Sequence, residues 1–168
     1  MGGRHGPSHL VRIGTSYDWV AVGCGSYHSL ALRGSGSLWS WGNNMTGQLG
    51  RASGSDPRIP AQVGSSTAWS AVEGGEWHSA ALRSNGSLWT WGSNSYGQLG
   101  LGNRTDRYAP TRVGTGKNWR LVTCGFDHTV AMRSDGSVWA WGDNNAGQLG
   151  LGNKVLRKSP TKVAIDLQ

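Results

Sequence analysis

The chain has 168 residues and a mass of 17.9 kDa, which suits one domain and is short for two. Its 28 glycines and 10 tryptophans beside a single phenylalanine exclude a disordered tail and a helical bundle, and no Gly-X-Y period indicates collagen. Sixteen basic against nine acidic residues give a net charge of +7, which favours acidic partners such as nucleic acid, an anionic membrane surface or an acidic protein face.

The sequence also indicates where the protein is located and what its cysteines do. No segment approaches the roughly 18 consecutive apolar residues of a membrane span, and the first ten residues lack the apolar core of a secretory signal. We therefore expect a cytoplasmic protein without membrane contact. Cys24 and Cys124 lack the spacing of metal ligands, so we expect reduced, buried thiols and neither a metal site nor a cofactor.

Residues recur along the chain with a period of 50 and without insertion or deletion, which divides it into the repeats 19–68, 69–118 and 119–168 of a single domain, 1–168. Residues 10–18 align with the end of a preceding, incomplete repeat, for which we expect a tail strand. Residues 1–9 match nothing and are expected to be flexible. The recurring aromatic and imidazole side chains are Trp19, Trp69, Trp119, Trp39, Trp89, Trp139, Trp41, Trp91, Trp141, His28, His78 and His128.

The pattern within each repeat predicts four short strands. In the third copy, residues 119–124 and 128–133 alternate in polarity, residues 138–142 are a run of β-formers, and a fourth strand is expected at 160–163. Asp135-Gly136, like Asn-Gly in the preceding copy, predicts a type I′ hairpin turn between the second and third strands, with positive φ at both central residues. Four antiparallel strands in 50 residues are typical of one β-propeller blade.

A long motif runs from Gly75 to Gly102 and is followed by P-T-x-V from Pro110 to Val113. It reads G-x-x-H-S-x-A-L-R-S-x-G-S-L-W-x-W-G-x-N-x-x-G-Q-L-G-L-G. This motif resembles the repeat of the regulator of chromosome condensation family (RCC1-like repeats), in the W-x-W-G form common in bacterial proteins, and the resemblance covers residues 10–168. It implies an all-β propeller of four-stranded blades, which usually number seven in that family. Three repeats therefore leave three alternatives: part of a longer array of blades, a ring completed by self-assembly, or a partial propeller of three blades.

Strand counting leads us to expect a homo-oligomer formed through blade edges. If each blade begins with the P-T-x-V strand, the blades span 10–42, 60–92 and 110–142, and residues 160–163 are one strand too many. That strand would pair with a neighbouring copy and displace its residues 10–13.

The recurring histidines and tryptophans are interpreted as structural. A catalytic base needs an orienting partner, and only His128 has an adjacent acid. We therefore predict that the nitrogens of the three histidine rings hydrogen-bond to backbone and tie strands together. The paired tryptophans, one residue apart, point to the same sheet face and are predicted to pack between blades. A plant ultraviolet-B photoreceptor of the family uses clustered tryptophans at its dimer surface. Its G-W-R-H-T motif is not matched at 75–78, where tryptophan comes one place later, which disfavours a tryptophan-based photoreceptor.

Glycine-rich segments do not predict nucleotide binding. Residues 47–50 lead into no helix whose amides would meet a phosphate, and residues 114–117 lack both the leading glycine and the following Ser or Thr of a phosphate loop.

The positive charge gathers in one segment type, at 101–118 and 151–168, each with four basic residues and one acid. These segments are either solvated loops or an electropositive surface for an acidic protein or nucleic acid. Their basic residues are Arg104, Arg107, Arg112, Lys117, Lys154, Arg157, Lys158 and Lys162.

Two classes of function remain open. The first is a non-catalytic protein-interaction scaffold that self-associates and has no catalytic residue. The second, implied by the resemblance, is guanine-nucleotide exchange on a small GTPase together with chromatin binding. The uninterrupted period leaves no inserted loop to wedge into a GTPase, and a fold does not carry a function with it, so we favour the scaffold.

Overall fold

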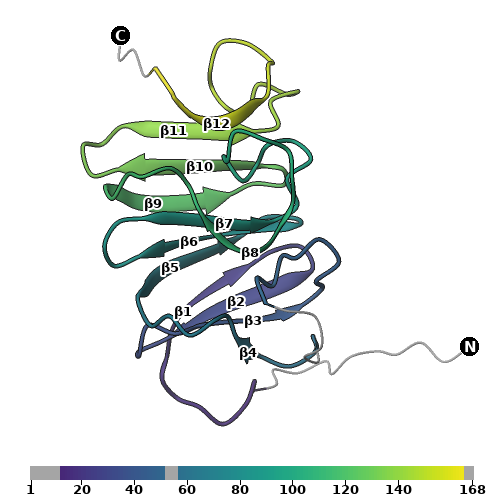
Figure 1. The fold of residues 1–168 in the computed structure, drawn as a ribbon, viewed down its shortest axis with the longest axis vertical. Helices are drawn as coiled ribbons and strands as arrows, with labels where there is room; N and C mark the ends of the chain where they lie inside the picture. The colour runs from purple at the N-terminus through teal and green to yellow at the C-terminus, as the bar shows by residue number, and fades with distance from the viewer. Residues whose placement is uncertain (1–11, 52–56, 165–168) are drawn as a thin grey trace, which may run out of the picture.

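The computed structural model describes residues 12–51 and 57–164, and within them it contains three four-stranded antiparallel sheets and no helix (Figure 1). This confirms the predicted all-β class and the propeller blades. The first sheet consists of β1 (Trp19–Cys24), β2 (His28–Arg33), β3 (Leu38–Gly42) and β4 (Ala61–Gln62). The second consists of β5 (Trp69–Gly74), β6 (His78–Arg83), β7 (Leu88–Gly92) and β8 (Arg107–Arg112). The third consists of β9 (Trp119–Cys124), β10 (His128–Arg133), β11 (Val138–Gly142) and β12 (Arg157–Lys162).

The fourth strand of each sheet comes from the same repeat as the other three. β12 pairs with β11, with Ala140 opposite Thr161 and Trp139 opposite Lys162. The predicted grouping into blades 10–42, 60–92 and 110–142 with a surplus strand is therefore wrong, because that strand completes its own sheet. It also begins earlier than residue 160. Proline is tolerated inside it because β12 is an edge strand, where a missing N–H costs no ladder bond.

The incomplete repeat expected at 10–18 is described only in part. Residues 12–18 form a bend with no strand, whereas residues 10 and 11 and the segment 1–9 lie outside the described residues.

The hairpin between the second and third strands is not the predicted type I′ turn. Gly86 and Gly136 have φ of 75° and 82°, but among the described residues no non-glycine has positive φ, so Asn85 and Asp135 do not fit a type I′ turn. The amide of Gly86 donates to the Arg83 carbonyl at 2.9 Å, which closes a three-residue loop of the kind that combines a type I turn with a left-handed glycine. The Asn85 side chain accepts from the amide of Ser87 at 3.1 Å and holds this conformation.

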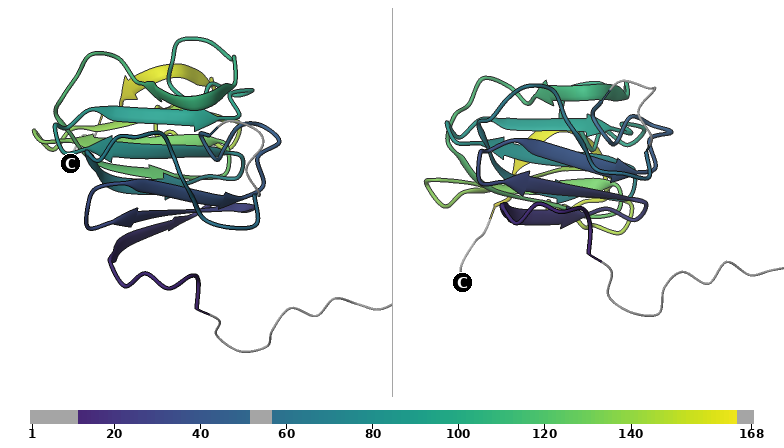
Figure 2. Two further views of the ribbon diagram at one scale, coloured as in Figure 1. Left: turned by 60° about the horizontal axis from the view of Figure 1, so that its bottom comes forward. Right: turned by 90° about the horizontal axis from the view of Figure 1, so that it is seen from below.

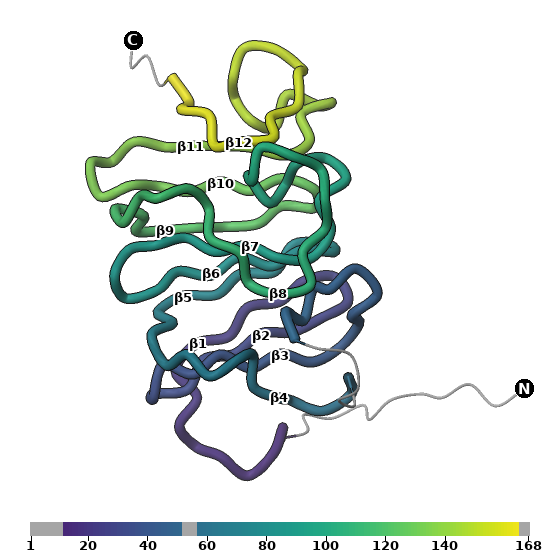
Figure 3. Tube along the Cα trace, viewed as in Figure 1, coloured from purple at the N-terminus to yellow at the C-terminus, as the bar shows by residue number. Residues whose placement is uncertain are grey.

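The three sheets stack on one another along the molecule (Figure 1), and the first strand of each later sheet lies against the first two strands of the sheet before it, β5 against β1 and β2 and β9 against β5 and β6. The other views show the sheets turning relative to each other through the stack (Figure 2). The chain trace shows the long connections before β8 and β12 leaving from the same side (Figure 3).

Two apolar clusters fill the spaces between the sheets. The first combines residues of the first sheet and its tail with residues of the second, namely Leu30, Leu32, Leu38 and Val63 with Trp69, Val72, Ala81 and Trp91. The second repeats this arrangement one blade later, with Ala80, Leu82, Leu88 and Val113 against Trp119, Val122, Ala131 and Trp141. The core of the protein is therefore an interface between blades, made twice.

The cysteines are free, but they are not both buried as predicted. Cys24 is exposed and Cys124 is partly buried. Gly74, at the position of Cys24 in the next repeat, lies against the backbone of Cys24 and Gly25, whereas no sheet in the described part of the chain covers Cys24 in this way.

The hairpin turn also anchors the start of the next repeat, and this can be tested by substitution. A Cβ at Gly86 would lie 2.1 Å from the Lys117 carbonyl oxygen, and the amide of Trp119 donates to the Gly86 carbonyl at 3.1 Å. Gly136 has the same conformation, but nothing lies within 4 Å of its Cβ position. We expect Gly136→Ala to lose about 1 kcal/mol of unfolding free energy, from backbone strain alone. Gly86→Ala should lose at least twice as much in urea denaturation, measured in protein dilute enough that no second copy covers Gly136. Equal losses would show that the turn does not hold the next repeat.

Candidate functional site

The centre of each blade interface is a carbonyl oxygen that accepts two hydrogen bonds from the next blade. The indole Nε1 of Trp91 donates to the backbone oxygen of Gln48 at 2.8 Å, and the hydroxyl of Ser79 donates to the same oxygen at 2.8 Å. One repeat later, Trp141 and Thr129 donate to the Gln98 oxygen at 2.9 Å and 2.8 Å. The Gly-Gln-Leu-Gly segments thus present a carbonyl to the neighbouring blade.

The recurring histidines join this network. Nε2 of His28 lies 2.7 Å from the Ser79 hydroxyl, and Nε2 of His78 lies 3.0 Å from that of Thr129. Because each hydroxyl gives its proton to a glutamine carbonyl, it accepts from the ring, so Nε2 carries the hydrogen. The histidines therefore bind a side-chain hydroxyl on the next blade. The histidines tie strands together as predicted, but the predicted backbone partner is wrong for His28 and His78, and the strands that they join belong to neighbouring sheets.

Burial keeps these rings neutral. It lowers the pKa of His28 to about 4 and, together with the charges of His28 and His128, that of His78 to about 3. Burial also lowers the pKa of His128, which is only partly covered. The acid beside it, Asp127, accepts from the Gln98 side chain at 3.0 Å and does not pair with the imidazole. The acid that does act on His128 is Asp143, whose charge raises the pKa of the imidazole against the larger effect of burial.

A second recurring unit is an arginine held between two tryptophan rings. The guanidinium of Arg133 lies 4.6 Å from the centre of Trp119 and 4.0 Å from that of Trp139. Arg83 and Arg33 stand in the same way between Trp69 and Trp89 and between Trp19 and Trp39. Sequence reasoning counted these arginines only as charge. Their recurrence at one place in every repeat, six residues before the W-x-W pair, was the signal that could have found them.

The two end sheets present uncovered copies of this interface. On the side of β1, Val22 is 72% exposed, whereas Val72 and Val122 at the same position are 4% and 3% exposed. Trp41 and Ser29 are half-buried there, although their counterparts are fully buried. We call this surface, with Trp19 and Ala31, the N-face. On the opposite side, the C-face consists of the half-buried side chains of His128, Val130, Met132, Val138 and Val163 with Gln148.

A cavity of about 400 Å³ lies on the N-face and is lined mainly by apolar groups, among them Trp19, Val22, Ala31 and Trp41. At the two internal interfaces, the residues equivalent to these lining groups are covered by apolar side chains of the preceding blade, mainly leucine and valine.

Some of the basic residues singled out in the sequence are engaged in contacts within the chain, and the others are exposed. Arg107 donates to the carbonyls of Thr105 and Asp106, and Arg157 to those of Val155 and Leu156, so both are used to hold their own loops. Arg112 lines a cavity between blades two and three. The exposed members are Arg104, Lys117, Lys154, Lys158 and Lys162.

Within the described residues no three His, Cys, Asp or Glu side chains are grouped as metal ligands. Nor does that part of the chain contain a helix of the length and apolar character needed to cross a membrane.

The repeat geometry is matched by a known family. The regulator of chromosome condensation (RCC1) repeat matches residues 35–82, 85–132 and 135–167, and a second description of the same repeat matches 19–48, 69–98 and 119–148. The chain belongs to the RCC1 repeat family. The second description starts each match at the first strand of a sheet, in agreement with the sheets themselves.

Solved structures give the same fold. Prp20p of Saccharomyces cerevisiae, described with its binding properties to Gsp1p and histones, has a TM-score of 0.80 at 24% identity over 91% of this chain and 40% of its own. Human WBSCR16 has a TM-score of 0.77 at 25% identity over 88% of this chain and 40% of its own. The mitochondrial RCC1 domain-containing protein RUG3 of Arabidopsis thaliana is 44% identical over 41 residues, 24% of this chain and 9% of its own. The chain therefore spans two-fifths of these solved structures and less than a tenth of RUG3.

The neutral state of the histidines predicts how stability depends on pH. His78 has a pKa of about 3 when folded and close to its ordinary 6.5 when unfolded, so its contribution is complete above pH 6.5 and is lost as the pH falls below that value. Between pH 6.5 and 4, His78 should lower the unfolding free energy by on the order of 3 kcal/mol. We expect His78→Gln, whose amide also donates to Thr129, to abolish this part of the pH dependence. Urea denaturation across this range measures it. An unchanged slope would mean that His78 is accessible to protons in the folded state.

Proposed function

We propose that this chain is a non-catalytic protein-interaction scaffold that associates head to tail with a second copy of itself. The observation that carries the proposal is the pair of uncovered end faces, because they repeat the two halves of an interface that the molecule already makes twice internally. A second copy offers the equivalent side chains in the equivalent register, and its Val163 displaces Ile13 of the first copy, which holds this position beside the N-face.

The apolar parts of the two faces correspond residue by residue to the internal interfaces. Leu30, Leu32, Leu38 and Val63 of one blade pack against Trp69, Val72, Ala81 and Trp91 of the next. The C-face has Val130, Met132, Val138 and Val163 at the first set of positions, and the N-face has Trp19, Val22, Ala31 and Trp41 at the second. Covering apolar surface of this kind is the main source of association free energy in water.

The polar groups of the two faces are complementary as well. His128 and the Gln148 carbonyl on the C-face correspond to His28 and Gln48, whereas Ser29 and Trp41 on the N-face correspond to Ser79 and Trp91. Head-to-tail contact supplies the Ser29 hydroxyl to His128 and the Gln148 carbonyl to Ser29 and Trp41. These bonds fix the register, because a shifted contact leaves them unmade.

The hairpin turn provides a third correspondence. A Cβ at Gly36 or Gly86 would lie 2.1 Å from the carbonyl of the linker to the next blade, but around Gly136 this space is open. A cavity of about 540 Å³ lies there, lined by Asp135, Gly136, Val138 and Val163 among others. Residues 16–18, which precede Trp19 as residues 66–68 precede Trp69, are the linker that fits it.

Two copies related in this way place six blades in one ring, within the range of about four to eight blades that propellers use. Such a contact joins different faces of the two copies, and it closes when the second C-face meets the first N-face.

The scaffold role is supported by the use of the recurring polar residues, since His28, His78, Ser79 and Thr129 are engaged in blade contacts. The exchange-factor and chromatin-binding alternative draws on relatives such as Prp20p, whose identity of 24% supports a shared fold alone.

Head-to-tail association has a distinctive test by complementation. We expect a mass of twice 17.9 kDa by light scattering, and we expect Val22→Lys on the N-face and Val138→Lys on the C-face each to give a single chain. Mixed together, these variants should form a two-chain species, because one keeps an intact C-face and the other an intact N-face.

Val20→Lys is the matched control. Val20 is 66% exposed, and the same position holds the exposed Ser70 and Arg120 in the other repeats, so this variant should associate like the wild type. A single-chain wild type at all concentrations would contradict association, and variants that do not complement would contradict its head-to-tail form.

A further inference from the structure

A cavity lies between blades two and three, away from the surfaces proposed for self-association. A cavity of about 480 Å³ is lined by two arginines, Arg112 and Arg133, and by the rings of Trp119 and Trp139. Backbone of residues 100–102 and 113–116, with Ser159 and Pro160, completes its wall. It is separate from the N-face and the C-face, which lie at the two ends of the stack.

The arginines in this cavity have unused hydrogen-bonding capacity. The Nε atoms of Arg112 and Arg133 are buried and have no hydrogen-bond partner, and the same holds for the other two stacked arginines, Arg33 and Arg83. Arg112 uses its Nη2 to hold the Thr115 carbonyl at 2.6 Å, which fixes the loop. In the described part of the chain no carboxylate forms an ion pair with Arg133. Asp135 nearby is fully exposed and accepts from Ser137 instead. A buried N–H on a charged group without an acceptor is costly.

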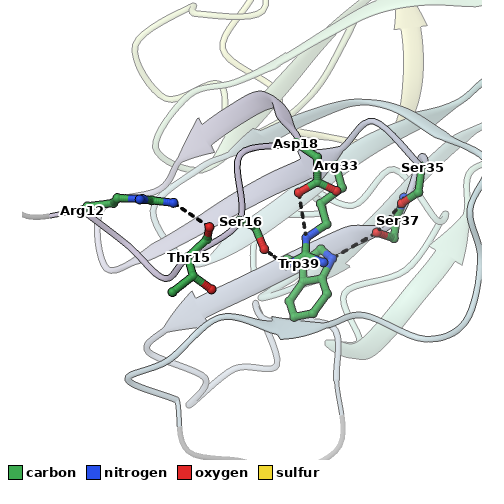
Figure 4. Close-up of polar contacts among 8 residues, drawn as sticks. All are labelled: Arg12, Thr15, Ser16, Asp18, Arg33, Ser35, Ser37 and Trp39. Carbon is green, nitrogen blue, oxygen red and sulfur yellow. Dashed lines mark hydrogen bonds and ion pairs between the residues drawn. The ribbon is translucent and has the colours of Figure 1, made fainter.

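The first blade indicates which charged group pairs with an arginine at this position. Arg33, at the position of Arg133, donates through Nη2 to the Ser16 hydroxyl at 2.6 Å, and its Nε lies 3.6 Å from the Asp18 carboxylate (Figure 4). In the third repeat these two positions hold Gly116 and Asn118, so both the hydroxyl and the carboxylate are missing. The rings on either side of the guanidinium are the same in both blades.

We propose that the cavity at Arg112 and Arg133 binds the side-chain carboxylate of an acidic peptide segment, which gives Arg133 the ion pair that Asp18 gives Arg33. The two guanidinium groups pair with the carboxylate, and the rings of Trp119 and Trp139 exclude water from the pair and strengthen it. The neighbouring exposed Lys117 and Lys158 favour a segment with more than one acidic residue. This deepens the scaffold role by naming the chemistry of its partner.

The test is calorimetric titration with N-acetyl-tetraglutamate amide, a peptide whose only carboxylates are on side chains. The double variant Gly116→Ser/Asn118→Asp reproduces the groups of the first blade and should neutralise Arg133 from within, so binding should weaken at least tenfold. Ala68→Asp is the matched control, because it adds the same charge beside Arg83 in blade two, and it should bind like the wild type. Arg112→Gln, which leaves the stacked arginine in place, should weaken binding comparably.

Three results would overturn the proposal. They are no binding to the wild type, binding that the double variant and Arg112→Gln leave undiminished, and equal binding of N-acetyl-tetraalanine, whose single carboxylate is its chain end. Because the mass in solution is measured without peptide, failure of this site is distinct from failure of self-association.

Discussion

The carbonyl oxygens of Gln48 and Gln98 are the points on which the arrangement of blades depends. Each accepts a hydroxyl and an indole N–H from the following blade, and both donors are buried where water cannot replace the carbonyl. Leaving one such donor unpaired costs about 1–3 kcal/mol, so the blades have one acceptable register. The left-handed Gly50, at φ 66°, lets this turn approach the Trp91 ring, because a Cβ there would lie 2.7 Å from Nε1.

The sequence predicts contacts within a strand or a repeat better than contacts between repeats. The strands 119–124, 128–133 and 138–142 follow from alternation and β-propensity, and β9, β10 and β11 have these bounds. The extent of β12 did not follow, because Pro160 indicates a strand end unless the strand is known to be an edge. The bond from His28 to Ser79 joins residues 51 apart, and periodicity reveals equivalence between repeats but not contact across them.

The two proposals rest on one kind of observation, which is a contact that is made in one repeat and missing in another. Trp41 and His128 lack the partners that Trp91 and His78 have, and a second copy supplies them. Arg133 lacks the carboxylate that Arg33 has, and a different molecule supplies it. An exact repeat period is informative for this reason, since each blade serves as the reference for the others and the deviations point to places where a partner is missing.

Exchange of the indole protons with solvent, followed by NMR, tests the central claim that these blades are built to be covered by the next one. The indole protons of Trp91 and Trp141 should exchange slowly at every protein concentration, because both are fully buried and bonded to the preceding blade. That of Trp41 should exchange rapidly in dilute solution and slow markedly as the concentration rises and a second copy covers the N-face. Rapid exchange at Trp91 and Trp141, or exchange at Trp41 that stays rapid at high concentration, would contradict the account.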